Sequence, residues 1–118
     1  MSIDKRMLSL AASVASEGNL RQDNRSFLLG AVGMRNDGVL VSARNIAATD
    51  VTPDAHAEAR VVKKITCDST VWVARVGKGT GCWALARPCI KCQRRMKTAG
   101  VRKVVYTIGP NEWGVLQF

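Results

Sequence analysis

The sequence predicts a three-layer α/β/α fold around a mixed sheet of about five strands. Helical and extended patterns alternate along the chain, and neither internal repeats nor linker-like runs divide its 118 residues. With 47% hydrophobic and 23% charged residues, a chain of this length buries enough apolar surface for one core. We therefore expect a single domain over residues 1–118.

Local periodicity and turn motifs predict the first four elements. Apolar residues from Ile3 to Val14 recur at helical spacing, which indicates an amphipathic core helix rather than a secretory signal. Asn36-Asp37-Gly38 is a hairpin turn between two apolar runs. Pro53 is tolerated in the first turn of the next helix, which Thr52 or Asp54 can cap. In chain order, these elements are helix 2–17, strand 27–35, strand 39–44 and helix 52–65.

The second half continues the alternation. Residues 70–76 are apolar on both faces, as a central strand covered by helices should be. The glycine-rich turn after them lacks the ending of a phosphate-binding P-loop. Pro88 opens a helix on which Cys89, Cys92, Met96 and Ala99 recur at the spacing of a buried stripe. The elements expected are strand 70–76, an extended piece 82–86, helix 89–99, strand 102–108 and strand 113–118.

The direction of the last strand follows from chain length. Ten residues follow Ile108, whereas a parallel crossover needs about a dozen or more linking residues. We therefore expect residues 113–118 to return antiparallel to residues 102–108 across the turn Gly109-Pro110-Asn111.

Positive charge is concentrated in the C-terminal part of the chain. The net charge is +9, and residues 75–118 carry nine basic residues with Glu112 as their one acidic residue. Such a field attracts phosphate, either on a small nucleotide or on a nucleic acid, although a solvated basic face is the alternative. No apolar run is long enough to cross a bilayer. We expect a cytoplasmic protein without a membrane partner.

Two short motifs together suggest a catalytic metal site. His56-Ala57-Glu58 and Pro88-Cys89-Ile90-Lys91-Cys92 form the pattern H-x-E…P-C-x-x-C. One imidazole and two thiolates can hold Zn²⁺ and leave its fourth position for water, whose pKa the metal lowers. The histidine motif and the cysteine motif each stand in the first turn of an expected helix, and a helix N-terminus favours the thiolate form of cysteine. Glu58 can take the proton of that water and pass it to a ring nitrogen.

A closed zinc site without enzymatic activity is the structural alternative. Cys67 or Cys82 would then be the fourth ligand, but Glu58 would have no role. We interpret these two cysteines as small buried hydrophobic residues instead. Two cysteines in a C-x-x-C pair and two without a pattern suit a reducing compartment better than a disulfide framework.

The composite motif resembles the zinc-dependent cytidine/deoxycytidylate deaminase superfamily, which includes tRNA adenosine and polynucleotide cytosine deaminases. The resemblance extends over roughly residues 5–108, including Leu29-Gly30-Ala31-Val32 and residues 100–104. It implies a cytidine-deaminase-like fold with one zinc per chain. The implied metal ligands are His56, Cys89 and Cys92, and Glu58 is the implied catalytic residue. The resemblance further implies that Asn45 hydrogen-bonds the sugar and that the Ala57 backbone N–H holds the base carbonyl. For Asn45, a turn residue at the end of a strand is the alternative.

Besides the short tail after Ile108, the chain departs from the superfamily pattern in two places. Residues 77–86 form an extra segment before the Pro-Cys motif, which we interpret as a hairpin extension at the edge of the site. Arg87 stands where relatives often carry a small or acidic residue. We expect Arg87 or Lys91 to contact a substrate phosphate, because an arginine fork beside a helix N-terminus suits that anion. Two surface charges are the alternative.

The sequence thus predicts hydrolytic deamination of a cytosine nucleoside or nucleotide, with oxygen replacing the amine at C4. The alternatives are a nucleic-acid base deaminase, acting on tRNA adenosine or single-stranded cytosine, and a catalytically silent nucleic-acid-binding module. An antiparallel last strand is usual among free-nucleoside deaminases, whereas a His-Cys-Cys site is more usual among nucleotide and polynucleotide enzymes. Few aromatic residues accompany the basic ones, which favours a small substrate. The oligomeric state stays open, with a homo-oligomer as one alternative.

Overall fold

The computed structural model describes residues 2–16, 28–45, 57–65, 67–77 and 80–118, and of residues 58 and 59 the backbone alone. The helices are α1 (Ile3–Ala15), α2 (Ala57–Val62) and α3 (Ile90–Thr98). The strands are β1 (Leu28–Met34), β2 (Leu40–Arg44), β3 (Ser69–Val76), β4 (Trp83–Ala84), β5 (Val101–Gly109) and β6 (Glu112–Gln117).

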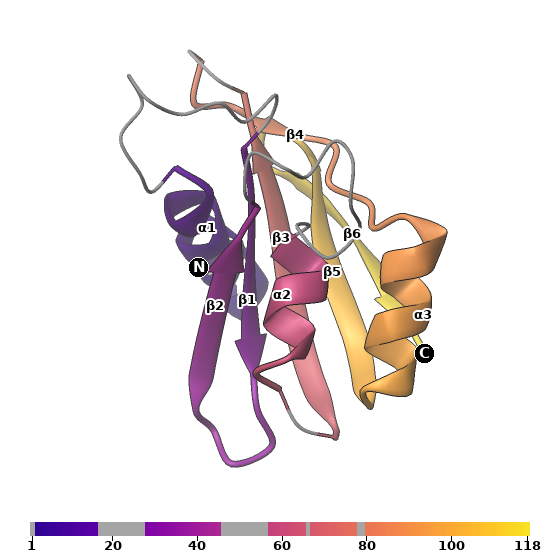
Figure 1. Cartoon of the computed structure of the whole chain (residues 1–118). Coiled ribbons are helices and arrows are strands. Elements are labelled where there is room, and N and C mark those ends of the chain that lie inside the picture. The colour runs from indigo at the N-terminus through magenta and orange to yellow at the C-terminus, as the bar shows by residue number, and fades with distance from the viewer. Residues whose placement is uncertain (1, 17–27, 46–56, 66, 78–79) are drawn as a thin grey trace.

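The molecule has three layers, as the alternation of elements predicts. A mixed sheet with the strand order β2-β1-β3-β5-β6 forms the middle layer, and β4 pairs with β3. In Figure 1, α1 lies behind this sheet, and α2 and α3 lie in front of it. The helix expected over 52–65 is α-helical as far as Val62. A tighter turn follows, in which the N–H groups of Lys64 and Ile65 each donate to the carbonyl oxygen three residues earlier. Its expected start, residues 52–56, lies outside the described residues.

Both expected hairpins are present. β1 and β2 pair antiparallel across the Asn36-Asp37-Gly38 turn, where Gly38 has a φ of 86° that favours glycine. β6 returns antiparallel to β5, with Lys103 opposite Gln117 and Thr107 opposite Trp113. β3 and β5 are the parallel pair at the centre. The prediction of an antiparallel last strand is therefore confirmed.

Two apolar cores hold the layers together. One lies between the sheet and α2 and α3, and the other lies between the sheet and α1. Gly30 explains how closely α1 approaches the sheet: a Cβ atom there would lie 2.1 Å from the backbone oxygen of Ala11. A larger residue at this position would push α1 away from β1.

The extra segment before the Pro-Cys motif extends β3 into a hairpin, as we expected. Trp83 pairs with Val76, and Ala84 pairs with Arg75. Thr107 of β5 joins this hairpin to the sheet, because its buried hydroxyl donates to the Ala84 oxygen at 2.7 Å and accepts from the Arg75 N–H at 3.1 Å. The Ala86 N–H also donates to the Thr107 oxygen.

The predicted burial of the cysteines is partly wrong. Cys67 and Cys82 are exposed, because they lie in turns before β3 and β4 rather than in the apolar layers. On the expected stripe of α3, Cys92 and Met96 are completely buried, whereas Cys89 at the N-cap is exposed and Ala99 at the C-cap is partly exposed. Within the residues described, no helix has the length and apolar character needed to cross a membrane.

Candidate functional site

The beginnings of α2 and α3 lie at the same end of the sheet. Both helices run opposite to the parallel strands β3 and β5 and pack against each other (Figure 1). α2 is tied to β2 at its other side, since Arg60 donates to the Arg44 oxygen at 2.6 Å and Lys64 donates to the Ser42 oxygen at 2.7 Å. The fold therefore brings together the two sequence segments that carry H-x-E and P-C-x-x-C.

Cys89 and Cys92 occupy the first turn of α3. Cys89 is the N-cap residue, with an extended backbone and no capping hydrogen bond from its side chain, and Cys92 lies one turn further, wholly buried in the core against α2. Gln93 holds this turn in place: its N–H donates to the Cys89 oxygen, and its side-chain amide donates to the Pro88 oxygen at 2.8 Å. The bond from Ala86 to β5 fixes the approach to this turn.

The H-x-E segment is described only in part. Ala57 is the first residue of α2 and is completely buried. Glu58 follows it within the helix, but its side chain lies outside the described residues, as does all of His56. Among the side chains that are described, no three of histidine, cysteine, aspartate or glutamate form a group that could hold a metal ion.

The family model for the cytidine and deoxycytidylate deaminase zinc-binding region matches residues 1–108. The chain belongs to this deaminase family. The match covers β1 to β5 and all three helices, so it includes both motifs and leaves β6 outside. A comparison with curated proteins gave no match. Membership supports zinc-dependent deaminase activity in general, and it implies Zn²⁺ as the cofactor.

The donors of this deaminase domain fit a zinc ion. Two thiols one helical turn apart stand at the beginning of α3, and the beginning of α2, directly after His56, packs beside α3. Sulfur and imidazole nitrogen are the donors that zinc prefers, and three of them leave one coordination position open. None of the four cysteines, all of which are described, forms a disulfide that would remove a thiol from this set.

Asn45 is tied to the first strand of the domain. It is completely buried at the end of β2, where its Oδ1 accepts from the Leu29 N–H at 2.9 Å and its own N–H donates to the Leu29 oxygen at 2.9 Å. The asparagine thus has a structural role, which is to join the end of β2 to β1 rather than to form a local turn. Its expected contact with the sugar stays a prediction.

Arg87 lies on the face of the sheet that carries α3. Its guanidinium is 5.9 Å from the centre of the Tyr106 ring, and its Nη1 donates to the Tyr106 hydroxyl at 3.4 Å. Gly114 of β6 makes room for this ring, since a Cβ atom there would lie 2.7 Å from the Tyr106 hydroxyl. Sequence analysis missed Tyr106: strand alternation predicts its face, but not its contact with Arg87.

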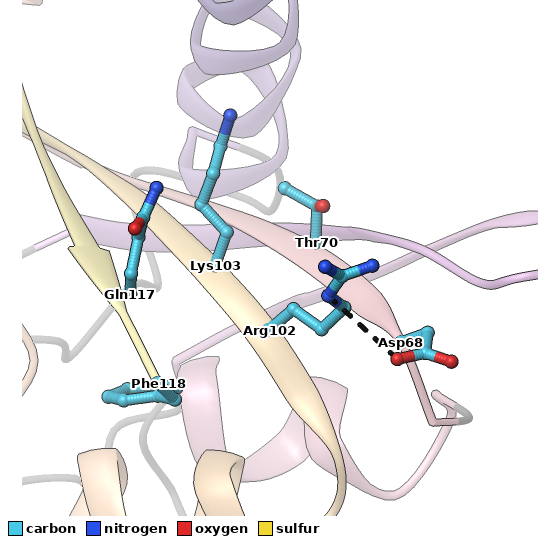
Figure 2. A pocket seen from close by; sticks show the side chains of 6 residues that line it. All are labelled: Asp68, Thr70, Arg102, Lys103, Gln117 and Phe118. Carbon is cyan, nitrogen blue, oxygen red and sulfur yellow. Dashed lines mark ion pairs between the residues drawn. The ribbon is translucent and has the colours of Figure 1, made fainter.

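A hollow of about 280 Å³ lies at the opposite end of the sheet. Figure 2 shows its lining at the start of β3 and β5 and the end of β6, with Lys103, Gln117 and Thr70 pointing toward α1. Arg102 forms an exposed ion pair with Asp68 there, at 3.9 Å. This hollow is separated from the first turn of α3 by the length of β5, so it does not belong to the candidate site.

Proposed function

We propose that the chain is a zinc-dependent hydrolase that deaminates a cytosine nucleoside or nucleotide. The observation that carries this proposal is the packing of α2, the helix that contains Glu58, against α3, with Ala57 at the start of α2 and Cys92 buried in the same core. The family match supports the reaction class. In the reaction, water adds at C4 of the base and ammonia leaves.

Each residue of the motif has a proposed task. Cys89, Cys92 and His56 hold zinc, which supplies an activated water when bound. Glu58 takes a proton from the water, delivers it to the ring nitrogen next to C4, and later protonates the leaving amine. The Ala57 backbone N–H holds the carbonyl of the base. Asn45, whose amide oxygen accepts from the Leu29 N–H, would bind the sugar.

The aromatic residues support a small substrate. In the basic part of the chain, Trp83 and Trp113 pack edge to face at 6.4 Å, and the ring of Tyr106 is buried against Gly114. These rings are therefore engaged in packing rather than set out as a row of platforms for unpaired bases. Phe118 lines the distant hollow.

Ammonia release from a panel of substrates tests the proposal. The zinc-loaded protein is incubated with free cytosine and adenine nucleosides, their 5′-monophosphates, and single-stranded oligonucleotides or tRNA. Deamination of a free cytosine nucleoside or nucleotide is the expected result. Release from polymers alone would replace the proposal with a nucleic-acid base deaminase. No release from any substrate would indicate a catalytically silent module.

A further inference from the structure

Seven basic residues gather on the layer formed by α2, the turn after it, and α3. They are Arg60, Lys63, Lys64, Lys91, Arg94, Arg95 and Lys97. Because Arg60 and Lys64 donate to β2 and Arg95 is partly buried, we define the cationic face by the four exposed residues Lys63, Lys91, Arg94 and Lys97. Glu58 is the one acidic residue in the sequence of either helix, and α3 contains none. The acidic side chains that the structure describes lie on other elements: Asp4, Asp37, Asp68 and Glu112.

The structure of the two helices gives no reason for positive charge at Lys63, Lys91 and Arg94. Arg60, Arg95 and Lys97 lie in the last turns of their helices, where positive charge stabilises the helix dipole, and Lys64 binds a β2 carbonyl. Lys63, Lys91 and Arg94 are exposed and make no side-chain hydrogen bond or ion pair with the described residues. Lys91 also lies in the first turn of α3, where the dipole disfavours a cation and no acidic residue offsets it.

A groove between the two helices adds a shape to this charge. A hollow of about 330 Å³ lies where α2 ends beside α3, and it is lined by Val62, Arg94, Arg95, Thr98 and Ala99. This groove is shallow and its lining is mostly apolar, so it contributes shape rather than charge, and Arg94 is the exposed arginine at its edge. The planar fork of arginine donates two parallel hydrogen bonds to phosphate oxygens, which makes it the residue best suited to a phosphodiester backbone.

We propose that the cationic face binds the phosphate backbone of a double-helical nucleic acid. Charge complementarity carries this choice, since such a backbone presents closely spaced negative charges to a surface whose described side chains include no carboxylate. No residue of α2 or α3 is aromatic, so the face offers phosphate contacts but no stacking for the unpaired bases of a single strand.

An anionic membrane fits the face less well. An interfacial helix inserts several apolar side chains among the lipids. The large exposed apolar residues of the described chain lie mainly on α1, β2, β5 and β6, and α2 and α3 together contribute Ile90 alone. The inference does not depend on the deaminase reaction, because phosphate contacts on this face leave the first-turn cysteines and Glu58 unused.

Fluorescence anisotropy with labelled DNA and RNA duplexes tests the proposal. The variant Lys63→Gln/Arg94→Gln/Lys97→Gln removes three exposed charges that have no described partner. We expect it to bind duplex at least roughly tenfold more weakly at low salt. The slope of log K against log salt should become shallower by about 2 to 3 units, because each duplex phosphate contact contributes about 0.9.

A matched control separates this face from net charge. Arg6→Gln/Arg102→Gln/Lys103→Gln removes the same charge from exposed α1 and from the distant hollow of Figure 2. The control should bind duplex within about twofold of wild type, with thermal unfolding verifying that both variants are folded. The proposal would be overturned by equal losses in the two variants or by no loss in either. It would also be overturned by tighter binding to a single strand than to a duplex, or by binding to phosphatidylserine vesicles without duplex binding. Glu58→Gln should bind duplex as wild type does, so the result is independent of deamination.

Discussion

Asn45 shows how a residue chosen for a substrate role can also hold the fold together. Its amide oxygen satisfies the Leu29 N–H inside the molecule, where water cannot replace it. We expect Asn45→Ala to lower the free energy of unfolding by about 1–3 kcal/mol, the usual loss when a buried donor is left without an acceptor. Urea unfolding measures the change. Gln117→Ala, at an exposed position, should change it by less than about 0.5 kcal/mol. Equal values for the two variants would contradict the structural role.

Arg87 is the residue on which a preference for nucleotides should depend. Arg87 lies two residues before Cys89, the N-cap of α3, and its guanidinium packs against the Tyr106 ring. If it binds the 5′-phosphate, Arg87→Ala should lower kcat/KM for the monophosphate roughly tenfold or more, as loss of a charge-assisted hydrogen bond does. The rate with the nucleoside should stay unchanged. Arg102→Ala, at the far end of β5, is the control. Equal losses with both substrates would mean that Arg87 supports only the local structure.

At the scale of elements, Thr107 joins the β3–β4 hairpin to β5 through one hydroxyl. Thr107→Val keeps the shape of the side chain and removes both hydrogen bonds, so we expect a loss of about 1–3 kcal/mol in stability. Thr107→Ser keeps the hydroxyl and removes one methyl, at a cost of about 0.8 kcal/mol. Chemical unfolding compares the two, and hydrogen exchange at the Ala86 amide reports on the hairpin directly. A serine variant less stable than the valine variant would contradict this role.

Sequence patterns predicted elements well where the determining interactions are local. The hairpin turn at Gly38 and the short return after Ile108 depend on a few neighbouring residues, so β1, β2, β5 and β6 were predicted to within two residues. Cysteine burial depends on tertiary position instead. A general preference of cysteine for the interior failed for Cys67 and Cys82, because both lie in turns outside the two cores.

The candidate site was predictable in its order along the chain, and less so in its surroundings. Spacing alone identified the two cysteines that begin α3. The bond from Asn45 to Leu29 and the contact of Arg87 with Tyr106 join residues 16 and 19 positions apart, on different elements. Periodicity carries no information about such pairs. His56 and the Glu58 side chain lie outside the described residues, so their roles stay predictions.

At the scale of the whole molecule, charge is arranged differently in space than along the sequence. The sequence places the basic excess after residue 74, with Arg60, Lys63 and Lys64 in the nearly neutral part. Packing of α2 against α3 places the end of α2, which Lys63 follows, beside Arg94 and Arg95 of α3. Arg60 and Lys64 donate to β2 instead, and Arg102 and Lys103 lie at the far end of the sheet. A count along the chain could not predict this face, because helix packing determines it.

Metal content distinguishes an open zinc site from a closed one. We expect one zinc per chain, retained in Cys67→Ala and Cys82→Ala and lost in Cys89→Ala. Cys67 lies beside Gly100 at the end of α3, and Cys82 lies exposed in the loop between β3 and β4. Elemental analysis of the purified variants measures the ratio, and circular dichroism verifies their folding. Loss of zinc from either turn variant would indicate a closed structural site with four protein ligands.

Deamination by wild type and Glu58→Ala, measured as ammonia released from a cytosine nucleoside or nucleotide, tests the proposed chemistry most directly. In the proposed mechanism Glu58 moves protons from water to the base, and such groups contribute roughly 10²–10⁴-fold to the rate. We predict that Glu58→Ala folds and contains zinc, and that its deamination rate falls by at least about 10²-fold. A zinc-containing Glu58→Ala protein whose rate stays within about tenfold of wild type would contradict the proposed mechanism.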